Sequence, residues 1–264
     1  MAPESVAATT APLRYRGYTA ELAIRVYRRA AAHSPVIVLL HGGGFVGGSL
    51  DAIAPLAATM AARLDVAVAT PAYTLATERP FPAAVEDAYA AISWAAASAR
   101  RERWDPRRLV VAGVEAGGNL AAAAAMMARD RGGPTLAAQI LVAPMLDPTL
   151  TSRSMQNAAA RTSRSLRECG ACYRAYLPNA TERLHPYAAP SSSSRLAGLA
   201  PTLILTAEDD PLGDEAEAYA AKLVTAGVPT EVSRLSRIES TVDTWTDEAW
   251  KAIDAFVRAR VGGP

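Results

Sequence analysis

Two glycine-rich segments of this 264-residue chain have the residue types that can hold a negatively charged oxygen. The first is residues 41–45, His-Gly-Gly-Gly-Phe, which follow an apolar run. Consecutive glycines let backbone N–H groups approach a ligand without Cβ clashes, and such groups can stabilise a developing oxyanion. A plain turn explains a glycine run about equally well. By itself, this segment is therefore only a candidate anion-binding loop.

The second segment is residues 113–120, Gly-Val-Glu-Ala-Gly-Gly-Asn-Leu, between a short apolar run and a helical pattern. A strand, a sharp turn and a helix in this order are typical of a nucleophile elbow. The glycines at 113, 117 and 118 permit such a turn. The elbow predicts that Glu115, at its centre, is presented at the C-terminal edge of the sheet, over the start of a helix.

Together these segments resemble the hormone-sensitive-lipase family of bacterial carboxylesterases. Three further stretches in the same order carry the resemblance: 73–82 (Tyr-Thr-Leu-Ala-Thr-Glu-Arg-Pro-Phe-Pro), 86–88 (Glu-Asp-Ala) and 207–212 (Ala-Glu-Asp-Asp-Pro-Leu). The resemblance runs from about residue 20 to the C-terminus. It implies the α/β-hydrolase fold and an oxyanion hole formed by backbone groups of Gly42, Gly43, Gly44 and Ala116.

The same resemblance identifies three positions where a catalytic triad would stand. Glu115 occupies the position of the family's serine nucleophile, Asp210 matches its acid, and Glu239 stands where its histidine is expected. The chain has three histidines, at 33, 41 and 185, and all of them precede Asp210. A Ser-His-Asp relay needs nucleophile and base within hydrogen-bond reach. We therefore predict that ordinary serine esterase activity is absent.

The resemblance also predicts that the three carboxylates converge. The interpretation we favour is a small-molecule-binding pseudoenzyme, in which Glu115 either binds ligand or simply plugs the loop N–H groups. One alternative is an enzyme with carboxylate chemistry, such as a lyase, dehydratase or hydratase, that uses a protonated glutamate as general acid. Another is a carboxylate site for Mg²⁺, Ca²⁺ or Mn²⁺. No cofactor and no resident metal are expected under the favoured interpretation.

The elements that must position these residues alternate along the chain. Apolar runs predict strands over 21–28, 35–41, 66–73, 109–113, 138–145, 202–208 and 230–235. Amphipathic patterns predict helices over 52–63, 80–100, 116–131, 213–226 and 244–260. This alternation predicts an α/β fold, a mostly parallel doubly wound sheet with helices on both faces. We predict a single domain over 1–264, in which 147–195 form a small helical cap with a helix near 163–177.

Composition restricts the partners. Half of the residues are hydrophobic, the formal net charge is +1, and no long charged run occurs. A small-molecule ligand is therefore expected, and nucleic acid or a membrane is not. The first twenty residues lack a signal-peptide core and no run of about 18 apolar residues occurs, which predicts a cytoplasmic protein. A homodimer is possible, because sheet-edge dimers are common in relatives.

Two features of the predicted cap stay open. Cys169 and Cys172 have no second Cys/His pair nearby, so we interpret them as ordinary thiols. The cap is also rich in arginine, at 153, 161, 164, 167 and 174. These arginines hint at an anionic ligand, but a solvated helix face accounts for them more simply.

Overall fold

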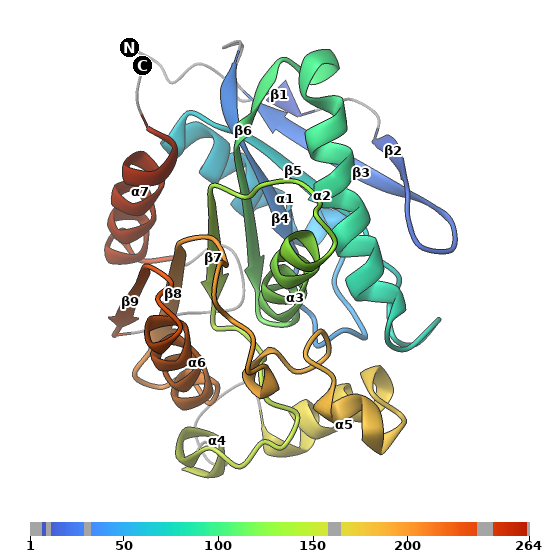
Figure 1. Ribbon diagram of the computed structural model, residues 1–264, viewed down its shortest axis with the longest axis vertical. Coiled ribbons are helices and arrows are strands. Elements are labelled where there is room, and N and C mark those ends of the chain that lie inside the picture. The colour runs from blue at the N-terminus through green and yellow to red at the C-terminus, as the bar shows by residue number, and fades with distance from the viewer. Residues whose placement is uncertain (1–6, 9–11, 29–32, 158–164, 237–244, 263–264) are drawn as a thin grey trace.

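The computed structural model describes residues 7–8, 12–28, 33–157, 165–236 and 245–262. The strands form one sheet in the order β1-β3-β5-β4-β6-β7-β8-β9, with β2 paired to β3 (Figure 1). Pairing is parallel from β5 to β9, while β1, β2 and β3 add antiparallel strands at one side. The strands are β1 (Ala7–Ala8), β2 (Leu13–Arg16), β3 (Glu21–Arg28), β4 (Ser34–Leu40), β5 (Ala67–Pro71), β6 (Trp104–Val114), β7 (Ala138–Val142), β8 (Thr202–Ala207) and β9 (Thr230–Leu235).

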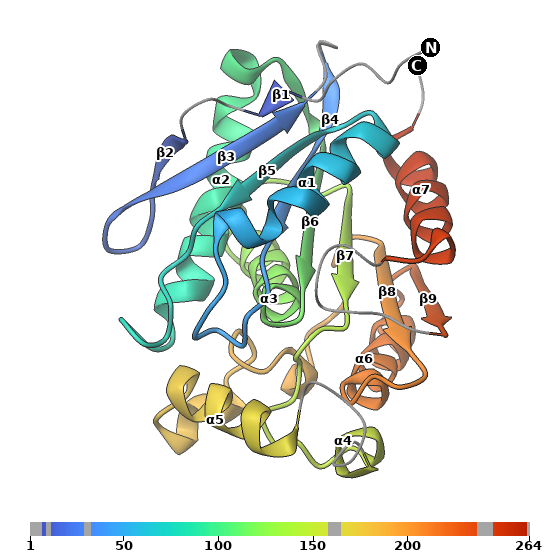
Figure 2. The ribbon, with the colours of Figure 1, turned by 180° about the vertical axis from the view of Figure 1, so that it is seen from behind.

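Helices cover both faces of this sheet. One hydrophobic core contains α1 (Leu50–Leu64) and α7 (Asp247–Val261), and the other contains α2 (Ala83–Glu102), α3 (Ala116–Asp130) and α6 (Gly213–Thr225). Every residue of β7 and β8 is buried, as expected for parallel strands covered on both sides. The predicted doubly wound α/β-hydrolase architecture is therefore confirmed (Figures 1 and 2).

Local capping explains where several helices begin. The side chain of Ser49 accepts the N–H of Ala52 at the start of α1, and Thr246 accepts that of Ala249 at the start of α7. Such caps satisfy backbone donors that have no partner inside the helix. None of the described helices combines the length and the hydropathy that a bilayer crossing demands.

The segment between β7 and β8 contains short helices and, in its described part, no strand. These helices are α4 (Arg153–Asn157), α5 (Leu166–Tyr176), η2 (Ala180–Leu184) and η3 (Pro190–Ser192). A capping box starts α5, because Ser165 and Glu168 each accept the other's backbone N–H. In Figure 2, α4 and α5 lie beyond the end of the sheet toward which β6 and β7 point. The helix predicted over 163–177 is thus α5, which begins three residues later.

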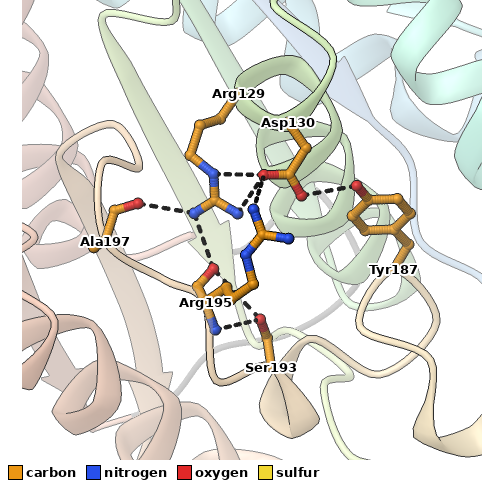
Figure 3. A network of polar contacts seen from close by, with 6 residues as sticks. All are labelled: Arg129, Asp130, Tyr187, Ser193, Arg195 and Ala197. Carbon is orange, nitrogen blue, oxygen red and sulfur yellow. Dashed lines mark hydrogen bonds and ion pairs between the residues drawn. The ribbon is translucent and has the colours of Figure 1, made fainter.

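A polar network links the residues that lead back to β8, from Tyr187 to Ala197, to the end of α3 (Figure 3). The carboxylate of Asp130 accepts hydrogen bonds from Arg129 Nε and Tyr187 Oη, both at 2.8 Å, and lies 3.7 Å from the guanidinium of Arg195. Arg129 also donates to the carbonyls of Arg195 and Ala197, both at 2.9 Å. Charge-assisted bonds of this kind, although exposed, hold the segment's second half against the α/β body.

Several strand boundaries differ from the predictions, and β7, for example, ends at Val142 instead of residue 145. β6 begins at Trp104, five residues earlier than predicted, because Asp105, Pro106 and two arginines interrupt the apolar run that marked the strand. β5 ends at Pro71 instead of residue 73. β2 was not predicted, since only Tyr15 among its four residues is buried and so short a strand leaves no periodic pattern.

A buried carboxylate on α2 offers a first test of this fold. Asp87 is fully buried and accepts the N–H groups of Tyr18, at 2.6 Å, and Thr74, at 2.8 Å. We expect Asp87→Ala to lower the free energy of unfolding by about 2–5 kcal/mol, because two backbone donors lose their acceptor. Urea denaturation measures this loss. The control Asp254→Ala removes an exposed i,i+4 pair with Arg258 and should cost at most about 0.5 kcal/mol. Equal losses in the two variants would contradict the role of Asp87 as a stabilising buried acceptor.

Candidate functional site

Glu115 lies at the turn between β6 and α3, in a conformation that non-glycine residues rarely adopt, with φ +58° and ψ −114°. Its N–H donates to the carbonyl of Val142 at 2.9 Å, and its carbonyl accepts the N–H of Gly118 at 3.0 Å. A backbone strained in this way persists only when its surroundings hold it. The predicted strand, sharp turn and helix are therefore present, with Glu115 at the centre.

Close packing at the turn brings the two glycine-rich segments together. A Cβ added to Gly117, in the first turn of α3, would overlap the carbonyl of Leu40 at the end of β4. Only glycine therefore lets the start of α3 approach the segment that leads into the glycine loop. This approach places the loop at residues 42–44 beside the side chain of Glu115.

The carboxylate of Glu115 reaches the backbone of the glycine loop. Its Oε2 accepts the N–H of Gly43 at 3.1 Å, and a Cβ on Gly42 would lie 2.9 Å from the same oxygen. Gly43 is held in place because its carbonyl accepts the N–H groups of Val46 and Gly47, at 3.2 and 2.9 Å. A carboxylate oxygen thus occupies a hydrogen-bond position at which a loop of this kind can hold an oxyanion.

The imidazole of His41 supports the loop from behind. It stacks on Tyr73 with ring centroids 4.1 Å apart, and the Tyr73 hydroxyl donates to the His41 carbonyl at 3.0 Å. Burial lowers the pKa of His41, so the ring is neutral in neutral solution. Burial, and then the charge of Glu115, raises the pKa of Tyr73 well above its ordinary value. His41 therefore packs against Tyr73 beside the glycine loop.

The other two histidines have partners elsewhere. The ring of His185 contacts those of Phe81 and Tyr187, with centroids 5.2 Å away in each case, and its Nδ1 accepts the N–H of Tyr187 at 3.1 Å. The backbone N–H of His33 donates to Arg103. These contacts give neither imidazole a place beside the elbow turn.

Asp210 follows β8, and its side chain is buried, with the residue 8% exposed. Its Oδ1 accepts the N–H of Leu212 at 3.0 Å. Since Asp210 and Glu115 both follow parallel strands, they lie at the same C-terminal edge of the sheet. Glu239 falls within 237–244, outside the described residues, so its convergence with the other two stays a prediction. In the described ranges, no three His, Cys, Asp or Glu side chains form a group that could hold a metal ion.

A small pocket of about 210 Å³ opens beside Glu115. It is lined by His41, Gly42, Gly43, Gly48, Ala52, Ile53, Val114 and Glu115. Drug-sized ligands usually occupy about 300–1,000 Å³. The described walls consist of apolar side chains, loop backbone and one carboxylate. A pocket of this size therefore suits a ligand of few atoms.

The thiol of Cys172 is a neighbour of this loop that sequence reasoning missed. It projects from α5, and a Cβ added to Gly44 would overlap its Sγ. Burial, and then the carboxylates of Glu115 and Glu168, raises the pKa of the Cys172 thiol, so the group is protonated at neutral pH. No local pattern in the sequence links Cys172 to Gly44, because the contact is made only when α5 folds over the sheet.

This contact predicts that replacing glycine by alanine lowers the free energy of unfolding more at Gly44 than at Gly132, although the two glycines have the same φ. Gly44 and Gly132 both have φ +61°, but a Cβ at Gly132 would meet nothing within 4 Å. We expect Gly44→Ala to lower the free energy of unfolding by about 2–4 kcal/mol and Gly132→Ala by only about 1 kcal/mol. Cys172→Ala should recover the difference in the Gly44→Ala background, as thermal unfolding can measure. Equal costs without recovery would mean that Sγ lies elsewhere.

Comparisons with known proteins show the family to which this chain belongs. The family described as alpha/beta hydrolase fold matches residues 37–238. The chain is 38% identical over 226 residues to carboxylesterase NlhH of Mycobacterium tuberculosis, which covers 83% of this chain and 70% of NlhH. It is also 38% identical to carboxylic ester hydrolase LipN of the same organism, over 84% of this chain and 61% of LipN.

Solved structures give the same picture. Esterase LipW from Mycobacterium marinum superposes with a TM-score of 0.87 at 34% identity, over 97% of this chain and 81% of LipW. A bacterial heroin esterase superposes with a TM-score of 0.87 at 32% identity, over 99% of this chain and 85% of that structure. Nearly all of the chain is thus similar in structure to esterases.

Proposed function

Because this chain belongs to the hormone-sensitive-lipase type of carboxylesterase relatives with the α/β-hydrolase fold, we propose that it is a pseudoenzyme that binds a small molecule without hydrolysing it. In this proposal Glu115 stands in the place of the serine nucleophile, Glu239 in that of the histidine, and Asp210 is the retained acid. The pocket beside the glycine loop is then a binding site. Residues 147–195 are its lid, within a single cytoplasmic domain.

One observation carries the proposal, namely the hydrogen bond from Gly43 N–H to Glu115 Oε2 at 3.1 Å. Ester hydrolysis needs such a donor free for the oxyanion of the intermediate. A carboxyl group already held by that donor is also a poor nucleophile, which counts against covalent chemistry at Glu115. Both effects favour binding over catalysis.

The proposal is tested by screening small molecules for thermal stabilisation of the protein and of two matched variants on α1. Ala52→Trp fills the pocket, since Ala52 lines it and is exposed. Ala62→Trp places the same side chain at an exposed position of the same helix that does not line the pocket. Any hit should stabilise the unchanged protein and Ala62→Trp, and lose at least about tenfold in affinity for Ala52→Trp. Hits that are insensitive to Ala52→Trp would reject this pocket as the binding site.

Carboxylate catalysis would give a different result in the same pocket. A general acid at Glu115 requires turnover whose pH profile disappears in Glu115→Gln. A ligand recovered chemically unchanged after incubation with the protein supports binding alone. A ligand converted to product, with conversion lost in Glu115→Gln, would replace our proposal with the enzymatic one.

We further propose a homodimer through β9, the last strand in the sheet order. If two copies of β9 pair antiparallel about a point between Val232 and Ser233, Glu231 faces Arg234 of the partner subunit. Val232 is 46% exposed at this edge. We expect light scattering to give twice the 27.7 kDa chain mass, and Val232→Glu to give monomer. Val224→Glu, at a 59% exposed position of α6, is the control and should stay dimeric; a monomeric unchanged protein would reject the dimer.

A further inference from the structure

Charge is divided unequally between the 147–195 insertion and the rest of the chain. The insertion contains seven arginines, no lysine and three acidic residues, a formal net charge of +4. Since the whole chain carries +1, the remainder carries −3. A prediction of partners from the average charge of the chain therefore misses a cationic segment that is concentrated in one place.

Three of these arginines are exposed on α5 and on η2, the element that follows it. Arg167 and Arg174 are seven residues apart on α5, which is two helical turns, so they share one face, and both are exposed. Arg183 is exposed in η2, which follows α5 after three residues. Within the described part of the chain, none of the three forms an ion pair. Their charges are therefore available to a partner.

The neighbouring acidic residues are used within the insertion. Glu168 accepts the backbone N–H of Ser165 at 2.8 Å, and Glu182 accepts that of Asn179 at 3.2 Å. Both carboxylates are committed to the start of a helix, where the helix dipole favours them. They reduce the positive potential of this surface without reversing it.

Exposed leucines accompany the arginines. Leu184 is 74% exposed, more than any other large hydrophobic residue in the described chain, and Leu166 is 36% exposed. Both neighbour an arginine in sequence, at 183 and 167. We call Leu166, Arg167, Arg174, Arg183 and Leu184 together the arginine face.

The arginine face is firmly supported and lies at one extremity of the molecule. On the inward side of α5, Cys169, Tyr173 and Tyr176 are buried, and Tyr176 stacks on Phe45 with ring centroids 3.9 Å apart. Figures 1 and 2 both show α5 at the end of the molecule opposite the two chain termini. This placement leaves the outward side open to a large flat surface.

We propose that the arginine face docks the protein on the surface of an anionic lipid bilayer. Arginine is attracted to the negative potential of lipid headgroups, and aliphatic side chains enter the boundary between headgroups and acyl chains. A nucleic acid would use the arginines but would gain little from the exposed leucines. Because α5 also carries Cys172 against Gly44, docking holds this neighbour of the glycine loop at the lipid surface. This inference does not depend on whether the pocket binds or hydrolyses its ligand.

The test is co-sedimentation of the full chain with phosphatidylcholine vesicles, with and without about 30% phosphatidylglycerol. We expect binding only to the anionic vesicles and its loss at about 0.5 M salt, where charges are screened over a few ångströms. The variant Arg167→Ala/Arg174→Ala/Arg183→Ala should bind about 100-fold more weakly, at about fivefold for each arginine. Leu184→Ser should bind about fivefold more weakly.

A matched control removes the same charge elsewhere. Arg16, Arg100 and Lys251 are exposed on β2, α2 and α7, and their triple alanine variant should keep binding within about threefold. Replacing the three arginines of the face by lysine should also keep it, since a lipid surface reads charge and not guanidinium geometry. Melting temperatures confirm that every variant is folded.

Two kinds of result would overturn the proposal. The first is an unchanged protein that does not sediment with the anionic vesicles, or a control triple variant that loses as much binding as the arginine variant. The second is arginine-dependent binding to single-stranded RNA or to an acidic protein without binding to vesicles, which would assign the face to another class of partner.

Discussion

The double variant Glu115→Ser/Glu239→His is expected to hydrolyse p-nitrophenyl acetate at least about 1,000-fold faster than the unchanged protein. Removing a triad serine or histidine costs a serine hydrolase on the order of 10⁶ in kcat, and the proposal assigns both losses to this chain. Under the proposal, the double replacement supplies the nucleophile and the base that belong with the retained acid Asp210. It also frees the Gly43 N–H, which Glu115 Oε2 now occupies, for the oxyanion. Recovery is partial because the surrounding pocket has not been shaped for turnover.

The single variants are the controls for this experiment. Triad members act as a unit, so Glu115→Ser alone should gain less than about tenfold. Glu115→Ala frees the same backbone donor without supplying a hydroxyl, and it sets the baseline. Esterase rates in the unchanged protein would contradict the proposed loss of hydrolysis. A double variant no faster than Glu115→Ala would contradict the assignment of Glu115 and Glu239 to the triad positions.

The free energy of unfolding is expected to fall as pH rises from about 5 to about 8, through the buried carboxyl of Glu215. Burial raises the pKa of Glu215 from its ordinary value of 4.5 to about 8, and the nearby Asp147 and Asp210 add to the increase. Hydrogen bonds from the N–H groups of Leu146, at 2.6 Å, and Asp147, at 3.3 Å, oppose it. Both bonds end on Oε1, which leaves Oε2 to carry the proton.

The free energy of unfolding falls with rising pH because the unfolded chain releases the Glu215 proton at a lower pH than the folded chain does. Between pH 4.5 and about 8 the unfolded chain has released the Glu215 proton while the folded chain still holds it, so raising the pH favours unfolding. The stability contribution is complete below about pH 4.5 and is lost as pH rises through about 8. At about 1.4 kcal/mol for each tenfold change in proton affinity, the loss amounts to about 5 kcal/mol.

Urea denaturation at several pH values measures this effect. Glu215→Gln keeps an oxygen that can accept the two N–H groups but does not titrate, so the decline with pH should flatten by about that amount. Glu217→Gln, on the same helix but 37% exposed and paired with Arg234, should leave the decline in place. A decline of equal slope in Glu215→Gln and the unchanged protein would mean that Glu215 is already ionised in the folded state.

The predictions for Glu115 and Glu215 depend on contacts in the folded chain. The sequence contains these residues but does not show which distant residues they contact. The run Ala-Glu-Asp-Asp-Pro-Leu at 207–212 marked Asp210 through family resemblance. Glu215, three residues beyond that run, has no local pattern that announces burial. Its burial arises because α6 packs beside the segment that follows β7, from which Leu146 and Asp147 donate. Such pairings between distant segments are settled by topology, and a single sequence does not contain them explicitly.

The sequence by itself determined the parallel core of the sheet, its covering helices and the elbow at Glu115. These depend on local properties, namely apolar runs long enough to be buried strands and glycines where the turn allows no Cβ. The insertion's helix α5 was also readable, since its pattern and its cap lie within a dozen residues.

Only the tertiary structure decided what these elements bring together. It placed Glu115 Oε2 against Gly43 and Cys172 against Gly44, and it left the arginines of α5 and η2 exposed. These arrangements arise because the parallel strands bring their C-terminal ends together and because the insertion folds over those ends. Both effects involve contacts between residues far apart in the chain. The free energy of such contacts depends on distance and burial in space, and neither quantity is a property of a residue and its sequence neighbours alone.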